Sequence, residues 1–260
     1  MRNLLHANFM RLRKSRTFWA CMALMAFHGL RLVYHLREGD GTMDSPTFQF
    51  FSDVGILLAV YYAAFVSGEY GDGIIRNKLT VGMTRPAIYF SNLISCIAAG
   101  LLMCAAFIIP NWTLTYIFFG QSRRVNYIRT PGQLMLSLLA SAVVIVSYSA
   151  LFSMLGMNIQ HKAAGPVAVV SAASVLYLNG MVCGTELALY QQSPERYQYS
   201  GLRLVYDHLF AEWLPGGQAR IYGPNVGCPP RALELMAYSL VVIVVSTGVG
   251  LLLFRRKDLK

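Results

Sequence analysis

The sequence carries little charge. Only 13% of its 260 residues are Asp, Glu, Lys or Arg, whereas 55% are hydrophobic and the mean hydropathy is +0.47. Soluble domains contain about 25% charged residues. A large buried core cannot account for this deficit. The composition therefore excludes an ordinary soluble domain and indicates several segments that cross a bilayer.

The usual catalytic motifs are also missing. There is no Gly-Lys dipeptide, so the chain lacks the phosphate-binding loop of P-loop ATPases. The patterns HExxH, CxxC and GxSxG do not occur, which removes the usual chemistry of zinc proteases, thiol oxidoreductases and α/β hydrolases. The five histidines are scattered without the spacing of metal ligands. We expect no enzymatic site, metal or cofactor in this chain.

Six apolar runs each reach the roughly 20 residues that a membrane-spanning helix needs. Four of them, at residues 88–119, 134–155, 163–185 and 235–254, contain no charged residue. The runs 17–36 and 48–68 contain Arg31 and Asp53 near their outer ends, where snorkelling or mutual pairing is enough to accommodate them. We predict an all-α integral membrane protein with one transmembrane domain over residues 1–260 and an uncleaved first span.

The basic residues predict the orientation. With both termini in the cytoplasm, 13 of the 22 Lys and Arg residues and only 3 of the 12 acidic residues lie inside. This distribution follows the positive-inside rule, although Arg123, Arg124 and Arg129 crowd a short outer loop against it. Topology and contact with anionic lipid therefore explain the basic pI, and we expect no nucleic-acid partner.

Cysteine usage leaves one question open. Cys21, Cys96 and Cys104 lie within spans, where small packing residues are common. Cys183 and Cys228 both fall near the outer ends of the last two spans. An oxidising exterior would permit a disulfide between them, and two free thiols are the alternative.

Residues 1–16 form a basic amphipathic segment. On a helical wheel Leu5, Phe9 and Leu12 share one face, and basic residues occupy another. This pattern predicts a helix in the cytoplasmic interface, with a simple basic tail as the alternative.

Residues 69–86 form the cytoplasmic link between the second and third spans. Gly71 and Gly73 permit a tight turn, Asp72 is the expected N-cap, and Gly82 is the expected C-terminal stop of a short helix at 74–80. On this helix we expect the apolar side chains to face inward and the two basic side chains to face water; the residues concerned are Ile74, Ile75 and Leu79, and Arg76 and Lys78.

Residues 186–231 form a long external connection before the sixth span. Leu202, Val205, Tyr206, Leu209 and Trp213 recur at helical spacing, and Pro215-Gly216 ends this pattern. The charged residues Arg203, Asp207 and Glu212 lie off that face. We predict an amphipathic helix that lies on, or dips into, the outer leaflet.

In and beside the link between the second and third spans, one set of residues forms a recognisable pattern: Phe65, Gly68, Glu69, Tyr70, Gly73, Ile75, Arg76, Asn77, Lys78, Leu79, Gly82, Arg85, Tyr89, Asn92 and Leu93. In this pattern the chain resembles permeases of the type-2 ABC exporter family, particularly small bacterial permeases for export of, or immunity to, peptide antibiotics. Such permeases have an N-terminal elbow helix, a cytoplasmic coupling helix and a partly re-entrant segment before the sixth span.

The resemblance implies a specific assembly in the bacterial inner membrane. Two permease chains, identical or related, would form the export pathway for a peptide, lipid-like or drug-like substrate. Separate subunits would bind ATP and magnesium and dock on the coupling helix. The coupling residues implied are Glu69, Tyr70, Gly71, Asp72, Gly73, Arg76, Asn77, Lys78 and Gly82. A non-transporting accessory, sensor or immunity subunit is the alternative, and substrate-binding residues are not identified.

Overall fold

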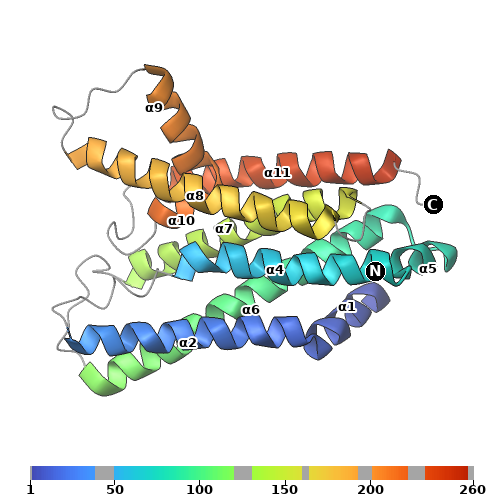
Figure 1. Ribbon diagram of the computed structural model, residues 1–260, viewed down its shortest axis with the longest axis horizontal. Coiled ribbons are helices and arrows are strands. Elements are labelled where there is room, and N and C mark those ends of the chain that lie inside the picture. Colours follow the sequence, from blue (N-terminus) through green and yellow to red (C-terminus); the bar gives the residue numbers. More distant parts are fainter. Residues whose placement is uncertain are drawn as a thin grey trace.

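The computed structural model is helical, and it describes residues 2–38, 50–119, 131–159, 164–192, 201–221 and 232–256 (Figure 1). The elements are α1 (Arg2–Lys14), α2 (Arg16–Glu38), α4 (Phe50–Gly71), α5 (Ile74–Thr80), α6 (Arg85–Phe119), α7 (Pro131–Asn158), α8 (Ala164–Gln192), α9 (Gly201–His208), the π-helical turn η2 (Leu209–Trp213), α10 (Pro215–Ile221) and α11 (Ala232–Arg256). Six of these, α2, α4, α6, α7, α8 and α11, are long and apolar enough to cross a membrane. The predicted six-span, all-α fold class is confirmed.

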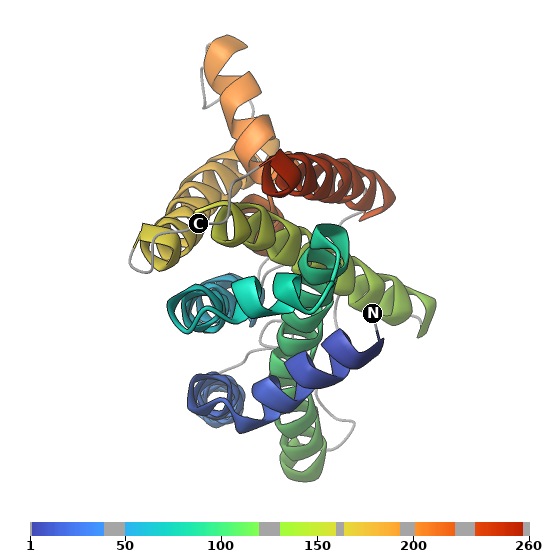
Figure 2. The same ribbon diagram turned by 90° about the vertical axis from the view of Figure 1, so that its right-hand side faces the viewer.

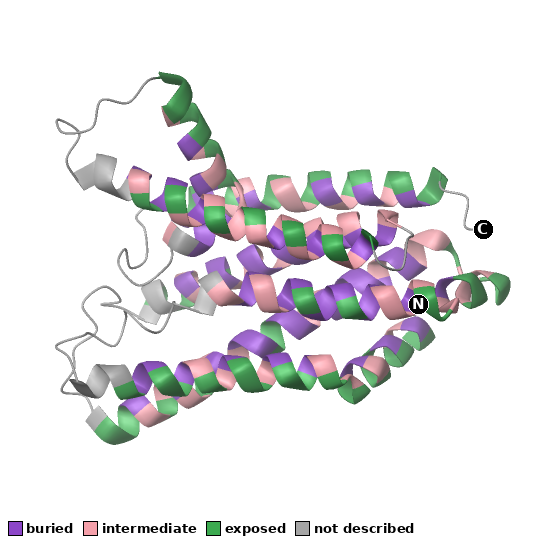
Figure 3. Cartoon of the chain, viewed as in Figure 1, coloured by how far each residue is buried: buried purple, intermediate pink, exposed green. Residues whose placement is uncertain are grey.

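The six long helices lie side by side, with α2 packed on α6, α4 on α8 and α7 on α11 (Figure 1). Helices α4 and α7 are central, since 56% of each apolar window is buried, against 28% for α8 and 22% for α11. The outer helices expose aliphatic side chains such as Val175, Leu178, Val244 and Leu252 (Figure 3). Exposing so much apolar surface to water is energetically unfavourable, whereas contact of this surface with lipid acyl chains is not. The chain is therefore an integral membrane protein.

The two ends of the bundle differ. Helices α1 and α5 and the last turn of α11 lie together at one end, which we call the α5 end, and α9 extends from the opposite end (Figures 1 and 2). Arg85 at the start of α6 donates to the carbonyl of Arg255 at 2.9 Å, which ties the end of α11 to this group. The first and last described residues, Arg2 and Arg256, thus share the α5 end.

Aromatic side chains fill the interior between the central helices. Tyr61, Tyr62, Phe107 and Phe152 are all fully buried in one core cluster. Glycine allows the closest helix approaches: a Cβ added at Gly55 would lie 2.7 Å from the Tyr148 ring. Small residues at such crossings let membrane helices pack tightly.

Helix α10 folds back into the bundle. Pro215, Gly216, Gln218 and Ala219 are buried, and a Cβ added at Gly216 would meet the carbonyl oxygen of Leu176 in α8 at 2.1 Å. Leu176 lies about 16 Å along α8 from the end of its apolar window, at 1.5 Å rise per residue. Helix α10 is thus beside the middle of a candidate span, as the expected re-entrant segment would be.

Candidate functional site

Helix α5 begins and ends on glycine. Gly73 is its N-cap, with φ 65°, and no side chain caps the helix, so the prediction that Asp72 is the N-cap is wrong. The left-handed conformation needed after the turn is one that glycine adopts without a Cβ penalty. At the other end, Gly82 has φ 85°, its N–H donates to the carbonyl of Leu79, and the N–H of Met83 donates to that of Lys78. These two bonds form a Schellman motif, which confirms Gly82 as the stop.

A buried carboxylate lies beneath α5. Glu69, in the last turn of α4, is fully buried and accepts hydrogen bonds from three helices. Arg11 Nη1 of α1 donates at 2.5 Å, Lys78 Nζ of α5 forms an ion pair, and Asn92 Nδ2 of α6 donates to the second carboxylate oxygen at 2.5 Å. A charge taken out of water is stable only when it is paired and hydrogen-bonded in this way.

Lys78 therefore does not face water as predicted. Its side chain is only 11% exposed, and it also donates to Asn8 Oδ1 of α1 at 3.3 Å. The helical pattern of α5 alone places Lys78 on the polar face. The buried Glu69 overrides that pattern, because a lysine stem can lie along apolar surface while its ammonium group reaches a carboxylate.

Asparagine side chains extend this cluster into the bundle. Asn8 Nδ2 donates to Asn92 Oδ1 at 2.8 Å and to Ser91 Oγ at 3.3 Å, and all three residues are buried. We call Asn8, Arg11, Glu69, Lys78 and Asn92 the Glu69 cluster. It joins α1, α4, α5 and α6 through side chains alone.

The elbow helix α1 uses a different inner face from the one its wheel indicates. Leu4, Asn8 and Leu12 are buried, whereas Phe9 is 40% exposed. Asn8 lies on the inner face, where its amide pairs with Ser91 and Asn92 of α6, while the basic Arg13 and Lys14 stay exposed. Leu5 and Phe9 then turn toward the outside of the bundle.

The neighbouring Tyr70 reaches a fifth helix. Its hydroxyl donates to the carbonyl of Met157 in α7 at 2.5 Å. Ile75 of α5 is buried in the cluster that also contains Ile88 and Met157. Movement of α5 would therefore act on α4, α6 and α7 at once.

The outer surface of α5 is free of the bundle. Arg76, Asn77, Thr80 and Gly82 are exposed, and Val81 is 76% exposed. In the described part of the chain Arg76 forms no ion pair. Of the predicted coupling residues, Glu69 and Lys78 form an ion pair and Tyr70 bonds to α7. Arg76 and Asn77 are exposed on the outer surface. Gly71 ends α4, Asp72 and Gly73 form the turn before α5, and Gly71 and Asp72 are exposed.

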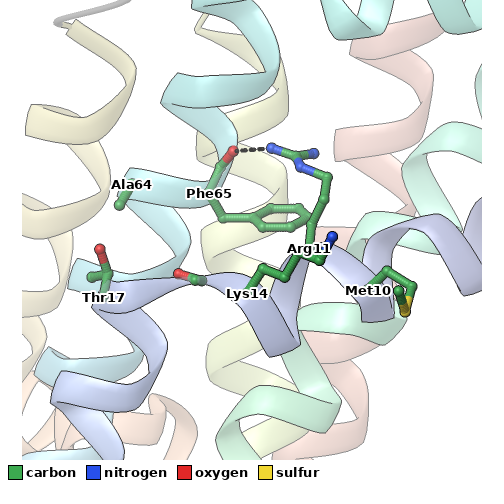
Figure 4. A pocket seen from close by; sticks show the side chains of 7 residues that line it. Met10, Arg11, Lys14, Thr17, Ala64 and Phe65 are labelled. Carbon is green, nitrogen blue, oxygen red and sulfur yellow. Dashed lines mark hydrogen bonds between the residues drawn. The ribbon is translucent and has the colours of Figure 1, made fainter.

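Arg11 also borders a pocket between the α1–α2 junction and α4 (Figure 4). Its guanidinium lies 4.5 Å from the centre of the Phe65 ring and donates to the Phe65 carbonyl at 3.4 Å. The pocket measures about 360 Å³, and its lining residues are Met10, Arg11, Lys14, Ser15, Thr17, Ala64 and Phe65.

A second group of buried polar side chains lies at α9 and η2. The apolar stripe is exposed, with Leu202 at 87% and Val205 at 67%, whereas Asp207 and Glu212 are buried. The π-helical turn η2 continues α9 without moving the stripe, since Leu209 and Trp213 are exposed as well. The stripe is placed to contact lipid, as the amphipathic prediction requires, but its charged side packs on the protein.

Gln218 anchors α10 in this region. Its Nε2 donates to the carbonyls of Glu212 at 2.5 Å and Leu235 at 2.9 Å, and its Oε1 accepts from Ser239 Oγ at 2.5 Å. All three polar positions of this buried amide are satisfied. The re-entrant helix is thereby linked to the sixth span.

Other charged and thiol groups have structural explanations. Asp53 pairs with His28 Nδ1 at 2.6 Å, not with Arg31. Cys183 is buried in α8, whereas Cys228 lies outside the described residues, so a disulfide between them stays a prediction. Within the described ranges no group of three or more His, Cys, Asp and Glu residues could hold a metal ion.

Sequence reasoning missed Asn8 and Arg11 as members of the site. Two signals were available: an asparagine between leucines on the inner face of a basic helix, and a glutamate at the end of an apolar span. The sequence does not indicate the partners of Asn8 and Arg11, because their contacts join residues 58 to 84 positions apart.

Comparison with protein-family models and with curated proteins finds no match to this chain. The structure defines the class of protein, which is an integral membrane protein with six candidate spans. At the α5 end of the bundle, the short helix α5 is bound to a buried carboxylate.

Proposed function

We propose that this chain is the transmembrane subunit of an ATP-driven ABC exporter, with α5 as the helix that couples it to a separate ATP-binding subunit. The observation that carries the proposal is the way in which α5 is attached to the bundle. One face is fastened to Glu69 and to the apolar cluster around Ile75, and the other presents Arg76, Asn77 and Val81 at the end of the bundle. A short helix held this way can receive a push from a docked protein.

The contacts of α5 provide a mechanical path for such a push. Displacing Lys78 would draw Glu69 with it, because separating a buried ion pair costs several kcal/mol. Glu69 is in turn bonded to α1 and α6, and Tyr70 to α7. The motion would thus pass to four helices as one unit.

The orientation proposed places the α5 end in the cytoplasm of a bacterial cell. Helices α1 and α5 and the last turn of α11 lie together at this end (Figure 1). They contain eight arginine and lysine residues: Arg2, Arg11, Arg13, Lys14, Arg76, Lys78, Arg255 and Arg256. A basic end of this kind favours the inside of the membrane.

The export pathway would lie between two permease chains. Side chains such as Tyr62, Phe107 and Phe152 fill the centre of this bundle. The fifth span, α8, is an outer helix that exposes Ser171 and Val175, and the second span, α4, packs against it. Its small residue Ala173 is buried in the core cluster, and its exposed face, with Val167, Val175, Leu178 and Val182, is available to a second chain.

The alternative function is a non-transporting accessory, sensor or immunity subunit that uses the same face of α5 to bind a cytoplasmic protein. Both functions need the exposed residues of α5. They differ in whether the partner is an ATPase and in whether its hydrolysis responds to an exported substrate.

The test is purification of the tagged chain from its native membranes in several mild detergents, followed by mass spectrometry. We expect a P-loop ATPase in stoichiometric amount. Arg76→Glu should lose at least about 90% of it, since one reversed charge at an interface centre costs more than the roughly 1.4 kcal/mol that corresponds to a factor of ten.

The matched control is Arg256→Glu, which reverses an exposed charge at the same end of the bundle and should retain the ATPase. Absence of an ATPase from the wild-type complex in every detergent would overturn the transporter proposal in favour of the accessory subunit. Equal retention by both variants would remove α5 as the docking helix.

A further inference from the structure

The pocket beside α1 has two walls of opposite character. Lys14 is exposed and Ser15 and Thr17 carry hydroxyl groups, whereas Met10, Ala64 and Phe65 are apolar and complete the lining (Figure 4). Ser15 Oγ accepts the N–H of Phe18 at 3.2 Å, so its hydroxyl hydrogen is available to a ligand. The polar wall therefore offers an ammonium group and hydroxyl groups as hydrogen-bond donors. A phosphate supplies oxygen atoms that accept such bonds.

The depth of the pocket matches the boundary between headgroups and acyl chains. Lys14 and Ser15 immediately precede the apolar window of α2, which begins at Arg16. Ala64 and Phe65 lie inside the apolar window of α4, about 9 Å from its end at Gly71 at 1.5 Å per residue. A ligand that fills the pocket would thus place charge at the membrane surface and apolar groups below it.

The charges around the pocket are unbalanced. Arg11 and Lys78 share the single carboxylate of Glu69. Lys14 adds a third cation, and among the described residues it has no acidic partner. The site therefore retains positive charge that an anion would compensate.

We propose that this pocket binds one anionic phospholipid, with its phosphate on Lys14, Ser15 and Thr17 and its acyl chain along Ala64 and Phe65. The ligand also lies against Arg11, which connects it to the Glu69 cluster and thereby to α5. This is a discrete site, distinct from the general contact of a basic helix with the membrane surface. The lipid proposal does not rest on the proposed transport function, because the pocket is formed entirely by residues of this chain.

The experiment is native mass spectrometry of the full chain in mild detergent, titrated with dioleoyl phosphatidylglycerol or dioleoyl phosphatidylcholine. We expect the first phosphatidylglycerol to bind about tenfold more tightly than phosphatidylcholine, because both lipids carry the phosphate but the choline of the second adds a cation beside Arg11 and Lys14. Lys14→Gln should abolish this preference. Arg13→Gln removes the same charge from an exposed position of α1 outside the pocket and should preserve it.

A second pair of variants tests the acyl wall without changing charge. Ala64→Phe should fill the pocket and weaken the first binding event about tenfold or more, whereas Ala237→Phe, on an exposed face of α11, should leave it unchanged. If Lys14→Gln and Arg13→Gln weaken binding equally, surface attraction explains it and the site does not exist. If excess inorganic phosphate displaces the lipid from wild type but not from Lys14→Gln, the ligand is a free phosphate and the lipid assignment is wrong.

Discussion

Removing the buried carboxylate of Glu69 should destabilise the α5 end more than any other single charge change among the described ion pairs. In Glu69→Leu, the Lys78 side chain, which is only 11% exposed, would lose its counter-charge, while Arg11, which is 31% exposed, could still turn toward water. Leaving one partner of a buried ion pair unpaired costs about 3–5 kcal/mol. We expect a loss of stability of that size.

The assay is equilibrium unfolding in mixed micelles, followed by far-UV circular dichroism. The matched control is Glu186→Gln, which removes the charge of the carboxylate whose two oxygens accept from Arg203 Nη2 at 2.6 and 2.7 Å. Because those side chains are 29% and 59% exposed, this pair should contribute only about 0–1 kcal/mol.

A double-mutant cycle separates pairing from packing. Glu69→Leu combined with Lys78→Met removes the unpaired charge together with its partner, so the double variant should be more stable than Glu69→Leu alone, with a coupling of about 1–3 kcal/mol. Additive losses, or a Glu69→Leu variant as stable as Glu186→Gln, would refute the central role of the carboxylate.

Three further changes test other parts of the fold by the same unfolding assay. Gly216→Ala should cost about 1–3 kcal/mol because its Cβ would meet backbone of Leu176, whereas Gly248→Ala, with nothing within 4 Å, should be neutral or slightly stabilising; equal effects would contradict the close approach of α10 to α8. Gln218→Leu should cost about 1–3 kcal/mol by removing the three hydrogen bonds of a buried amide, among them the one that pairs Ser239 Oγ, and an unaffected variant would mean that α10 is not anchored there. Gly82→Ala should cost about 1 kcal/mol through its φ of 85° and increase protease cleavage between α5 and α6; unchanged cleavage would show that the Schellman turn does not restrain α5.

Much of the fold can be predicted from composition and periodicity. Span position follows from apolar length, and the predicted helix at 74–80 matches α5 because glycines bracket it on both sides. Such signals are local: each residue contributes through its own hydrophobicity or its own backbone freedom.

The partners of polar residues cannot be predicted this way. The wheel of α5 places Lys78 in water, yet its side chain is only 11% exposed. The pattern of residues 202–213 sets Asp207 and Glu212 off the apolar face, but it does not show that these two residues are buried. In both cases a helical wheel assumes that polar side chains avoid the interior. For Lys78, the carboxylate of Glu69 on another helix reverses that preference, and the position of that carboxylate depends on tertiary packing.

The sequence by itself determined that this chain crosses a membrane, how many segments are able to do so and where a short connecting helix begins and ends, because hydrophobic length and glycine conformation are properties of neighbouring residues. Only the tertiary structure decided that Asn8, Arg11, Lys78 and Asn92 converge on Glu69, that α10 lies beside the middle of α8, and that a pocket opens next to Lys14. These features join residues far apart in the chain, and they exist because a buried charge or amide must find its partner wherever packing brings one within reach.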